Sequence, residues 1–176
     1  MENALNRMWS VSAGVLLALS LLALWSWPKV FGVDTHPIFG WAEAQSGVSW
    51  LEPGLRYAIG AVAFVIAVLV LIPRTRLAGG WAALTLSVLF IAAHLTPWLG
   101  VNIPAYTPLM EALAAGRTAE EIAAMGLKTD KGAHMTLAFI NAGLAVVMLG
   151  AEYAMRKPKP RSLRETLAQQ HLAAPA

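Results

Sequence analysis

Long apolar runs dominate this chain, and short polar segments separate them. A helix needs about 20 mostly apolar residues to cross a hydrocarbon layer roughly 30 Å thick. Four runs approach or reach that length, and they predict membrane-spanning helices at about 9–27, 55–72, 79–99 and 133–154. The pattern therefore predicts an all-α integral membrane protein, with an antiparallel four-helix bundle over 1–155 and a basic tail over 156–176.

The first and second connections between these spans differ in character. The second connection is the tight basic turn Pro73-Arg74-Thr75-Arg76. The first is long, and aromatic residues are spaced along it among glycine and proline: Phe31, Phe39, Trp41 and Trp50. Aromatic residues in such a segment predict that it lies along the membrane interface.

The third connection carries signals for two short helices. Thr107-Pro108 can start the first of them, because proline is favoured at the beginning of a helix. Thr118 and Glu121 have the spacing of a capping box for the second. Gly116 and Gly126 follow as helix stops, and Asp130 is placed to cap the fourth span. The third connection is therefore expected to fold over one end of the bundle.

Lysine and arginine predict the orientation of the bundle, because cytoplasmic connections are enriched in both. The second connection carries Arg74 and Arg76, and five basic residues lie between Arg156 and Arg164. The two long connections contain acidic residues alongside their basic ones. Both termini are therefore expected in the cytoplasm, with the long connections outside, in the inner membrane of a bacterium.

Composition narrows the possible functions. Hydrophobic residues make up 57% of the chain and charged residues 13%, and the mean hydropathy is +0.58. The net charge is +3, but the basic cluster follows the last span directly, which favours contact with anionic lipid head groups over nucleic acid. The chain has no cysteine, which excludes disulfides, thiolate metal sites and cysteine-ligated iron–sulfur clusters.

The first span could be mistaken for a signal peptide, because Arg7 precedes its apolar core. It ends in Trp25-Ser26-Trp27-Pro28 rather than in a small-residue cleavage site. Tryptophans at the end of a span are typical of the membrane interface. An uncleaved anchor is therefore favoured.

Small residues mark the helix faces that are expected to pack together, since close backbone approach stabilises helix pairs in lipid. They recur at helical spacing in three spans: Gly60, Ala63 and Ala67, together with Arg56, in the second; Gly79, Ala83 and Ser87 in the third; Ala138 and Ala142 in the fourth.

Several short motifs occur in an order that resembles a known family. They are Leu51-Glu52-Pro53-Gly54-Leu55-Arg56-Tyr57, Gly60, Leu71-Ile72-Pro73-Arg74-Thr75, Gly79-Gly80 and His94-Leu95-Thr96. Over about residues 50–100 this arrangement resembles the DoxX family of small four-helix membrane proteins, and Asp130-Lys131-Gly132 extends the resemblance loosely over 128–150. The resemblance implies a four-span helical bundle that serves a membrane redox system. The family's founding member is a small subunit of a thiosulfate:quinone oxidoreductase. Ala63 departs from the family pattern, because many relatives carry a glutamate there.

Polar residues are rare in the spans, and several are expected near the same, outer end of the bundle. Glu52 and Arg56 open the second span, and His134 lies in the first turn of the fourth. His94 lies about one helical turn before Trp98, near the end of the third. Ionisable residues within a membrane are costly to bury, so they are functional candidates.

Three interpretations of this cluster remain open. In the first, His94 and His134 hydrogen-bond to the carbonyls of a quinone, Arg56 stabilises a developing anion, and Trp50, Tyr57 or Trp98 stacks on the ring. In the second, the two histidines ligate a b-type haem. In the third, Arg56 pairs with Glu52, and the histidines bond to loop carbonyls.

The other polar residues are expected to have structural roles. His36 precedes Pro37 in a connection and is expected to be solvated. Asn141 is expected to bond to a neighbouring helix, and Glu152 to pair with Arg156 at i, i+4. The chain is thus predicted to be a small subunit of a quinone-linked complex that contacts lipids and other membrane subunits. The alternative is a non-catalytic structural or assembly subunit that fills a helix interface.

Overall fold

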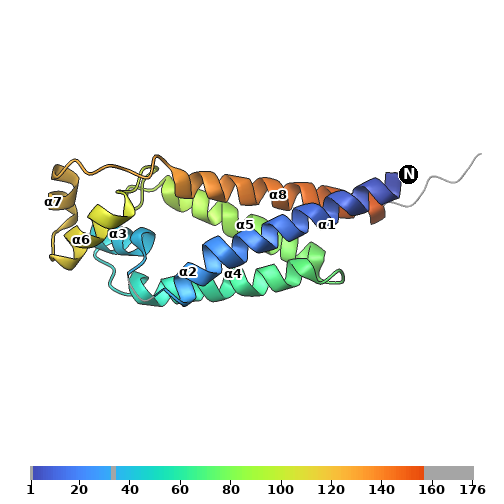
Figure 1. Ribbon diagram of the computed structural model, residues 1–176, viewed down its shortest axis with the longest axis horizontal. Helices are drawn as coiled ribbons and strands as arrows, with labels where there is room; N and C mark the ends of the chain where they lie inside the picture. Colours follow the sequence, from blue (N-terminus) through green and yellow to red (C-terminus); the bar gives the residue numbers. More distant parts are fainter. Residues whose placement is uncertain (1, 33–34, 157–176) are drawn as a thin grey trace, which may run out of the picture.

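The computed structural model describes residues 2–32 and 35–156, which form helices joined by turns and short connections (Figure 1). The long helices are built from these segments: α1 (Glu2–Ser20), the π-helical segment η1 (Leu21–Ser26) and α2 (Trp27–Val30); η2 (Leu51–Leu55) and α4 (Arg56–Leu71); α5 (Arg76–His94); and α8 (Ala133–Arg156). Three short helices gather at one end of the bundle: α3 (Pro37–Ser46), α6 (Tyr106–Ala114) and α7 (Ala119–Ala124). That end is called the loop end below, and the opposite end, where α1 begins and α8 ends, is called the terminal end.

Within the described residues, four helices are long and apolar enough to cross a membrane: Asn3–Val30, Leu51–Leu71, Arg76–His94 and Ala133–Arg156. Each of the four predicted spans therefore corresponds to a helix that is long and apolar enough to cross a membrane. The third span is shorter than expected, because it ends at His94. Pro97 disfavours helical backbone at the residue before it, and 95–99 forms turns instead. Trp98 consequently lies off α5, and 60% of its surface is exposed. Apart from Arg156, the predicted basic tail lies outside the described residues.

The first span crosses the bundle diagonally (Figure 1). Near the terminal end it packs on α8, where Gly14 lies against Met148. Toward the loop end, η1 and α2 pack on α4, and Gly60 allows close contact with Val30 and Lys29. The first span is therefore a neighbour of α8 at one end and of α4 at the other.

Small residues bring the spans together on most of the predicted faces. Ala63 and Ala67 of α4, and Ala83 of α5, are fully buried. At Gly79 the spans approach through their backbones, since an added Cβ would lie 2.7 Å from the backbone nitrogen of Val70. The predicted faces of α4 and α5 are confirmed.

The predicted face of α8 is confirmed only in part. Ala138 is buried, whereas Ala142 is half-buried, and Ala145 takes its place in the core. Asn141 is also buried, but neither of its amide atoms has a hydrogen-bond partner among the described residues. The expected bond from Asn141 to a neighbouring helix is therefore not present.

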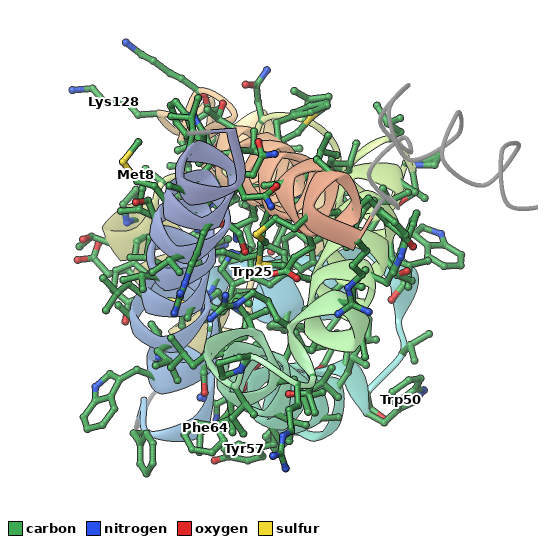
Figure 2. All side chains as sticks on the ribbon, turned by 90° about the vertical axis from the view of Figure 1, so that its right-hand side faces the viewer. Met8, Trp25, Trp50, Tyr57, Phe64 and Lys128 are labelled. Atoms are coloured by element: carbon green, nitrogen blue, oxygen red, sulfur yellow. The ribbon has the colours of Figure 1, made fainter. Side chains whose placement is uncertain are left out.

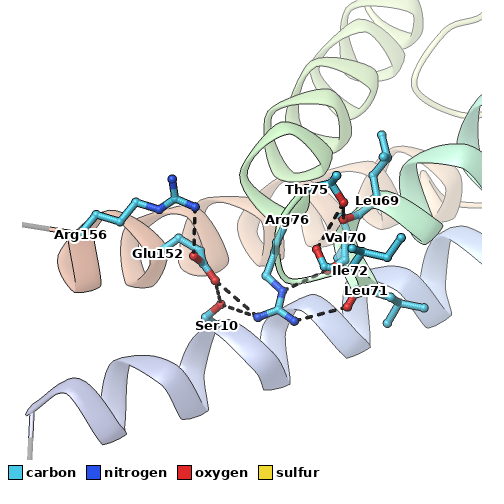
Figure 3. Close-up of polar contacts among 9 residues, drawn as sticks. All are labelled: Ser10, Leu69, Val70, Leu71, Ile72, Thr75, Arg76, Glu152 and Arg156. Carbon is cyan, nitrogen blue, oxygen red and sulfur yellow. Dashed lines mark hydrogen bonds and ion pairs between the residues drawn. The ribbon is translucent and has the colours of Figure 1, made fainter.

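At the terminal end, Arg76 joins four helical segments (Figure 3). Its Nε donates to the carbonyl oxygen of Val70 at 3.0 Å, and its Nη1 lies 3.4 Å from both Ser10 Oγ and Glu152 Oε1. Ser10 Oγ donates to the same Glu152 oxygen at 2.5 Å. The predicted pair of Glu152 with Arg156 is present at 3.9 Å, but the spacing gave no sign that Arg76 and Ser10 would join it.

The aromatic residues of the first long connection, which were expected along the membrane interface, are divided between the core and the surface. Pro37 begins α3, and Gly47, with a φ of +71°, ends it. Phe39 and Trp41 are buried against the bundle, and Trp41 Nε1 donates to the carbonyl oxygen of Leu99 at 3.2 Å. The apolar side chains of α3 are covered by protein, which leaves Phe31 and Trp50 as the exposed aromatic residues of this connection.

The predicted structure of the third connection is confirmed. Gly116 follows α6 with a φ of +69°, and Thr118 and Glu121 form both hydrogen bonds of the capping box that starts α7. Asp130 accepts hydrogen bonds from the backbone nitrogens of Gly132 and His134, and so caps the start of α8.

Candidate functional site

Arg56 and Glu52 form an ion pair at the start of α4, as one of the sequence interpretations expects. The Arg56 Nε lies 2.6 Å from Glu52 Oε1, and both side chains are at least nine-tenths buried. Arg56 also donates to the carbonyl oxygen of Gly32 and to Tyr57 Oη, each at 3.1 Å. Its guanidinium lies over the Tyr57 ring, 4.5 Å from the ring centroid. These contacts connect the segment after α2 to α4.

His94 is engaged within its own helix. Its Nδ1 lies 2.9 Å from the carbonyl oxygen of Phe90, one turn earlier, so this nitrogen carries the donated proton. Its Nε2 has no hydrogen-bond partner among the described residues. The residue is 1% exposed, and it does not line either of the two chambers described below.

His134 is oriented by Asp130, which lies just before α8. The His134 Nδ1 lies 2.8 Å from Asp130 Oδ2, and Asp130 Oδ1 accepts from the backbone nitrogens of Ile103 and Gly132, each at 3.0 Å. Burial alone would raise the pKa of Asp130, but these hydrogen bonds outweigh burial and hold the pKa below its ordinary value. The ionised carboxylate accepts the Nδ1 proton, which leaves Nε2 as the free nitrogen of a neutral His134.

Two adjoining chambers lie beside His134 at the loop end. The wide chamber has a volume of about 500 Å³, and its walls include Pro28 and Tyr106. The narrow chamber has a volume of about 150 Å³, and its walls include Trp25, Lys29, Phe90 and Leu137. Both are lined by the same three residues from the first span, α3 and α8: Leu24, His36 and His134. The two chambers therefore form one site between these helices.

His36 was expected to be solvated, but it is half-buried and lines both chambers. Its ring centroid lies 6.4 Å from that of His134, and its buried Nδ1 has no hydrogen-bond partner among the described residues. Burial, followed by the positive charge of Lys29, lowers the pKa of His36 to about 3. His36 is therefore neutral at pH 7 and supplies one nitrogen donor and one acceptor.

Lys29 is the least expected member of the site. Only 3% of its surface is exposed, and its Nζ lies 5.4 Å from the centroid of the buried Trp25 ring. In the view along the bundle, Trp25 lies close to the centre, whereas Trp50, Tyr57 and Phe64 lie at the periphery (Figure 2). None of the ion pairs between described residues includes Lys29.

The path of the first span explains where the chambers lie. Because η1 and α2 pack on α4 rather than on α8, the first span and α8 move apart toward the loop end. The chambers lie in this space, and Leu24 on their wall is exposed at the surface of the bundle. Leu24 and Trp25 belong to the π-helical segment η1, and π-helical turns occur frequently at functional sites.

The structure thus divides the predicted cluster. Of its members, His134 alone lines the two chambers. Glu52, Arg56 and Tyr57 line a separate cavity of about 540 Å³. Trp98 lines a further, apolar cavity of about 380 Å³ together with Trp50. Lys29 and His36 were missed, although the position of Lys29 one turn after Trp25 could have indicated a shared helix face.

A haem between His94 and His134 does not fit this arrangement. Such a haem needs both histidines as ligands, and His94 lines neither chamber. Among the described residues, no group of three or more histidine, aspartate or glutamate side chains is placed to hold a metal ion.

Comparisons of the chain with protein-family models, with curated proteins and with solved structures gave no significant match. They neither support nor oppose the resemblance to the DoxX family. The function is therefore argued from the site itself.

Proposed function

We propose that this protein is a small integral membrane subunit that binds a quinone-type head group and serves a quinone-linked redox complex. One observation carries the proposal: the mostly apolar chambers beside His134, with a few polar side chains on their walls, lie where the first span and α8 separate. A quinone is dissolved in the bilayer and must reach its site from the side. The motifs shared with the DoxX family support the same function.

The side chains of the site suit the two ends of such a head group. His36 supplies a donor for a carbonyl oxygen in the narrow chamber, whose walls also include Lys29, Trp25 and Phe90. The free Nε2 of His134 accepts a hydrogen bond from a hydroxyl group of the reduced form. Asp130 would stabilise the imidazolium that forms if His134 takes up that proton.

In this proposal the bundle is antiparallel, with both termini in the cytoplasm and the loop end outside, in the inner membrane of a bacterium. Arg74 and Arg76 in the second connection, together with Arg156 at the end of α8, support this orientation. The site would then face the outer leaflet. Lipids surround the bundle, and further membrane subunits supply the electron donor and acceptor.

The test is equilibrium binding of a short-chain naphthoquinone in its reduced, hydroxyl-bearing form to the purified chain in mild detergent without oxygen, with two histidine variants compared. His134→Gln should weaken binding about 2- to 13-fold, which corresponds to the loss of one hydrogen bond. His94→Gln is the matched control, because His94 is buried outside the chambers, and it should leave the affinity unchanged.

The absence of saturable binding by the unchanged protein would refute the proposed function. Equal losses of affinity in both variants, in proportion to a loss of folded protein, would favour the alternative of a non-catalytic structural or assembly subunit. A tag placed near Gly116 that is labelled only in inverted vesicles would overturn the proposed orientation.

A further inference from the structure

We infer that the narrow chamber is an anion site, in which Lys29 binds the charged oxygen of an ionised aromatic head group such as a hydroxyquinone anion or a semiquinone. This inference rests on the proposed function and adds the charge of the ligand. It predicts that the protein discriminates between head groups of nearly the same size by their charge.

Lys29 is almost completely buried. Lysine is almost never fully buried unless a partner compensates its charge, yet this side chain is 97% buried, as its 3% exposure implies. The Trp25 ring, 5.4 Å from Nζ, provides a cation–π contact. Such a contact is weaker than the cost of removing an ammonium group from water. A counter-charge is therefore missing from the described part of the site.

The carboxylates nearby are already committed to other partners. Asp130 accepts hydrogen bonds from His134, Ile103 and Gly132. Glu52 is paired with Arg56 at 2.6 Å. The walls of the narrow chamber itself hold no carboxylate among the described residues; their polar members are Lys29, His36 and His134. These three polar side chains favour the binding of an anion over that of a cation.

The remaining walls indicate the kind of anion. Leu24, Trp25, Phe90 and Leu137 make most of the chamber apolar and partly aromatic. The chamber also adjoins the wide chamber through shared walls, so a ligand can extend from one into the other. A flat aromatic body with one charged oxygen matches these walls better than a small hydrated inorganic ion.

A pair of probes tests the inference on the full-length protein in mild detergent at pH 7. One probe is 2-hydroxy-1,4-naphthoquinone, whose hydroxyl group is ionised at this pH, and the other is 2-methyl-1,4-naphthoquinone, which is neutral and of similar size. The unchanged protein should bind the hydroxy probe more tightly. Lys29→Met should weaken binding of the hydroxy probe about tenfold or more, because charged hydrogen bonds are the stronger ones. It should change the affinity for the methyl probe less than twofold.

The outcomes separate this inference from the function on which it rests. If the unchanged protein binds both probes equally, or if Lys29→Met weakens both equally, the anion site is refuted while quinone binding stands. If neither probe binds, both proposals fail. Lys29→Gln, which keeps a polar side chain without the charge, should repeat the result and replaces Lys29→Met if that variant does not fold.

A final control tests whether an acidic residue of the chain already compensates the charge of Lys29. Asp34 is the acidic residue nearest to Lys29 in the sequence, and it lies outside the described residues. Asp34→Asn should leave the affinity for the hydroxy probe unchanged. An increase of tenfold in that affinity would show that Asp34 already compensates Lys29, and would refute the inference.

Discussion

Replacing Arg76 by methionine tests whether the polar contacts at the terminal end hold the spans together. The substitution removes the groups that donate to Val70 and Ser10. It also removes the arginine partner of the Glu152 carboxylate, whose side chain is only 9% exposed. Breaking a buried ion pair by removing one partner costs about 3–5 kcal/mol. Glu152 keeps its bond from Ser10 and the distant Arg156, so we expect a loss of about 2–3 kcal/mol of unfolding free energy.

A double-mutant cycle separates the pair from its surroundings. Glu152→Gln alone leaves Arg76 with the carbonyl oxygen of Val70 as an acceptor, and should cost about 1–2 kcal/mol. In the double variant no buried carboxylate is left without its partner. Its loss of stability should therefore be smaller than the sum of the two single losses by about 1–2 kcal/mol.

The assay is reversible unfolding in mixed micelles, followed by circular dichroism, with Arg156→Met as the control. Arg156 lies 3.9 Å from the same carboxylate, but its side chain is 55% exposed, and its loss should change stability by less than about 0.5 kcal/mol. If Arg76→Met is no more destabilising than Arg156→Met, or if the effects in the cycle are additive, the proposed role of Arg76 is wrong.

Two further predictions concern the core and the site. Gly79→Ala should destabilise the bundle by about 1–3 kcal/mol relative to Gly143→Ala. The new Cβ would lie 2.7 Å from the backbone nitrogen of Val70, whereas nothing lies within 4 Å at Gly143. Equal unfolding free energies for the two variants would contradict this packing. The folded-state pKa of His36 is about 3, against an ordinary value of 6.5. The stability that the neutral side chain gives the folded protein is therefore fully present above pH 6.5, and it is lost as the pH falls toward 3. That loss should reach at most about 2 kcal/mol between pH 7 and 5. His36→Gln should remove this part of the pH dependence, and an unchanged pH profile would show that His36 is exposed to water.

The elements predicted well are those governed by local sequence. Hydropathy located the four spans, because crossing hydrocarbon requires a continuous apolar run. The capping box of Thr118 and Glu121 located α7 to the residue, since both of its hydrogen bonds form within one turn. The small-residue faces of α4 and α5 were predicted because helical spacing fixes which residues share a face.

The elements predicted poorly depend on contacts between distant segments. The aromatic residues of the first connection were expected to lie along the membrane interface, but Phe39 and Trp41 of α3 pack inward on the bundle, and His36 lies directly before them. The burial of Lys29 follows from the diagonal path of the first span and from the π-helical turn in η1. A π-turn shifts the helical register by one residue. A constant period of 3.6 residues therefore misplaces the side chains that follow it.

Two groups of titratable residues in this protein differ in how they reach a partner. Arg56, His134 and Arg156 each contact an acidic residue four positions away, so the charges are compensated within the same stretch of chain. Such pairs are visible in the sequence, and they hold or orient segments. Among the described residues, Lys29 and His36 form no ion pair, and tertiary packing buries Lys29 and half-buries His36. Burying a polar group without a local partner is costly. The strongest candidates for ligand contact are therefore these two residues, although no neighbouring charge in the sequence marks either of them.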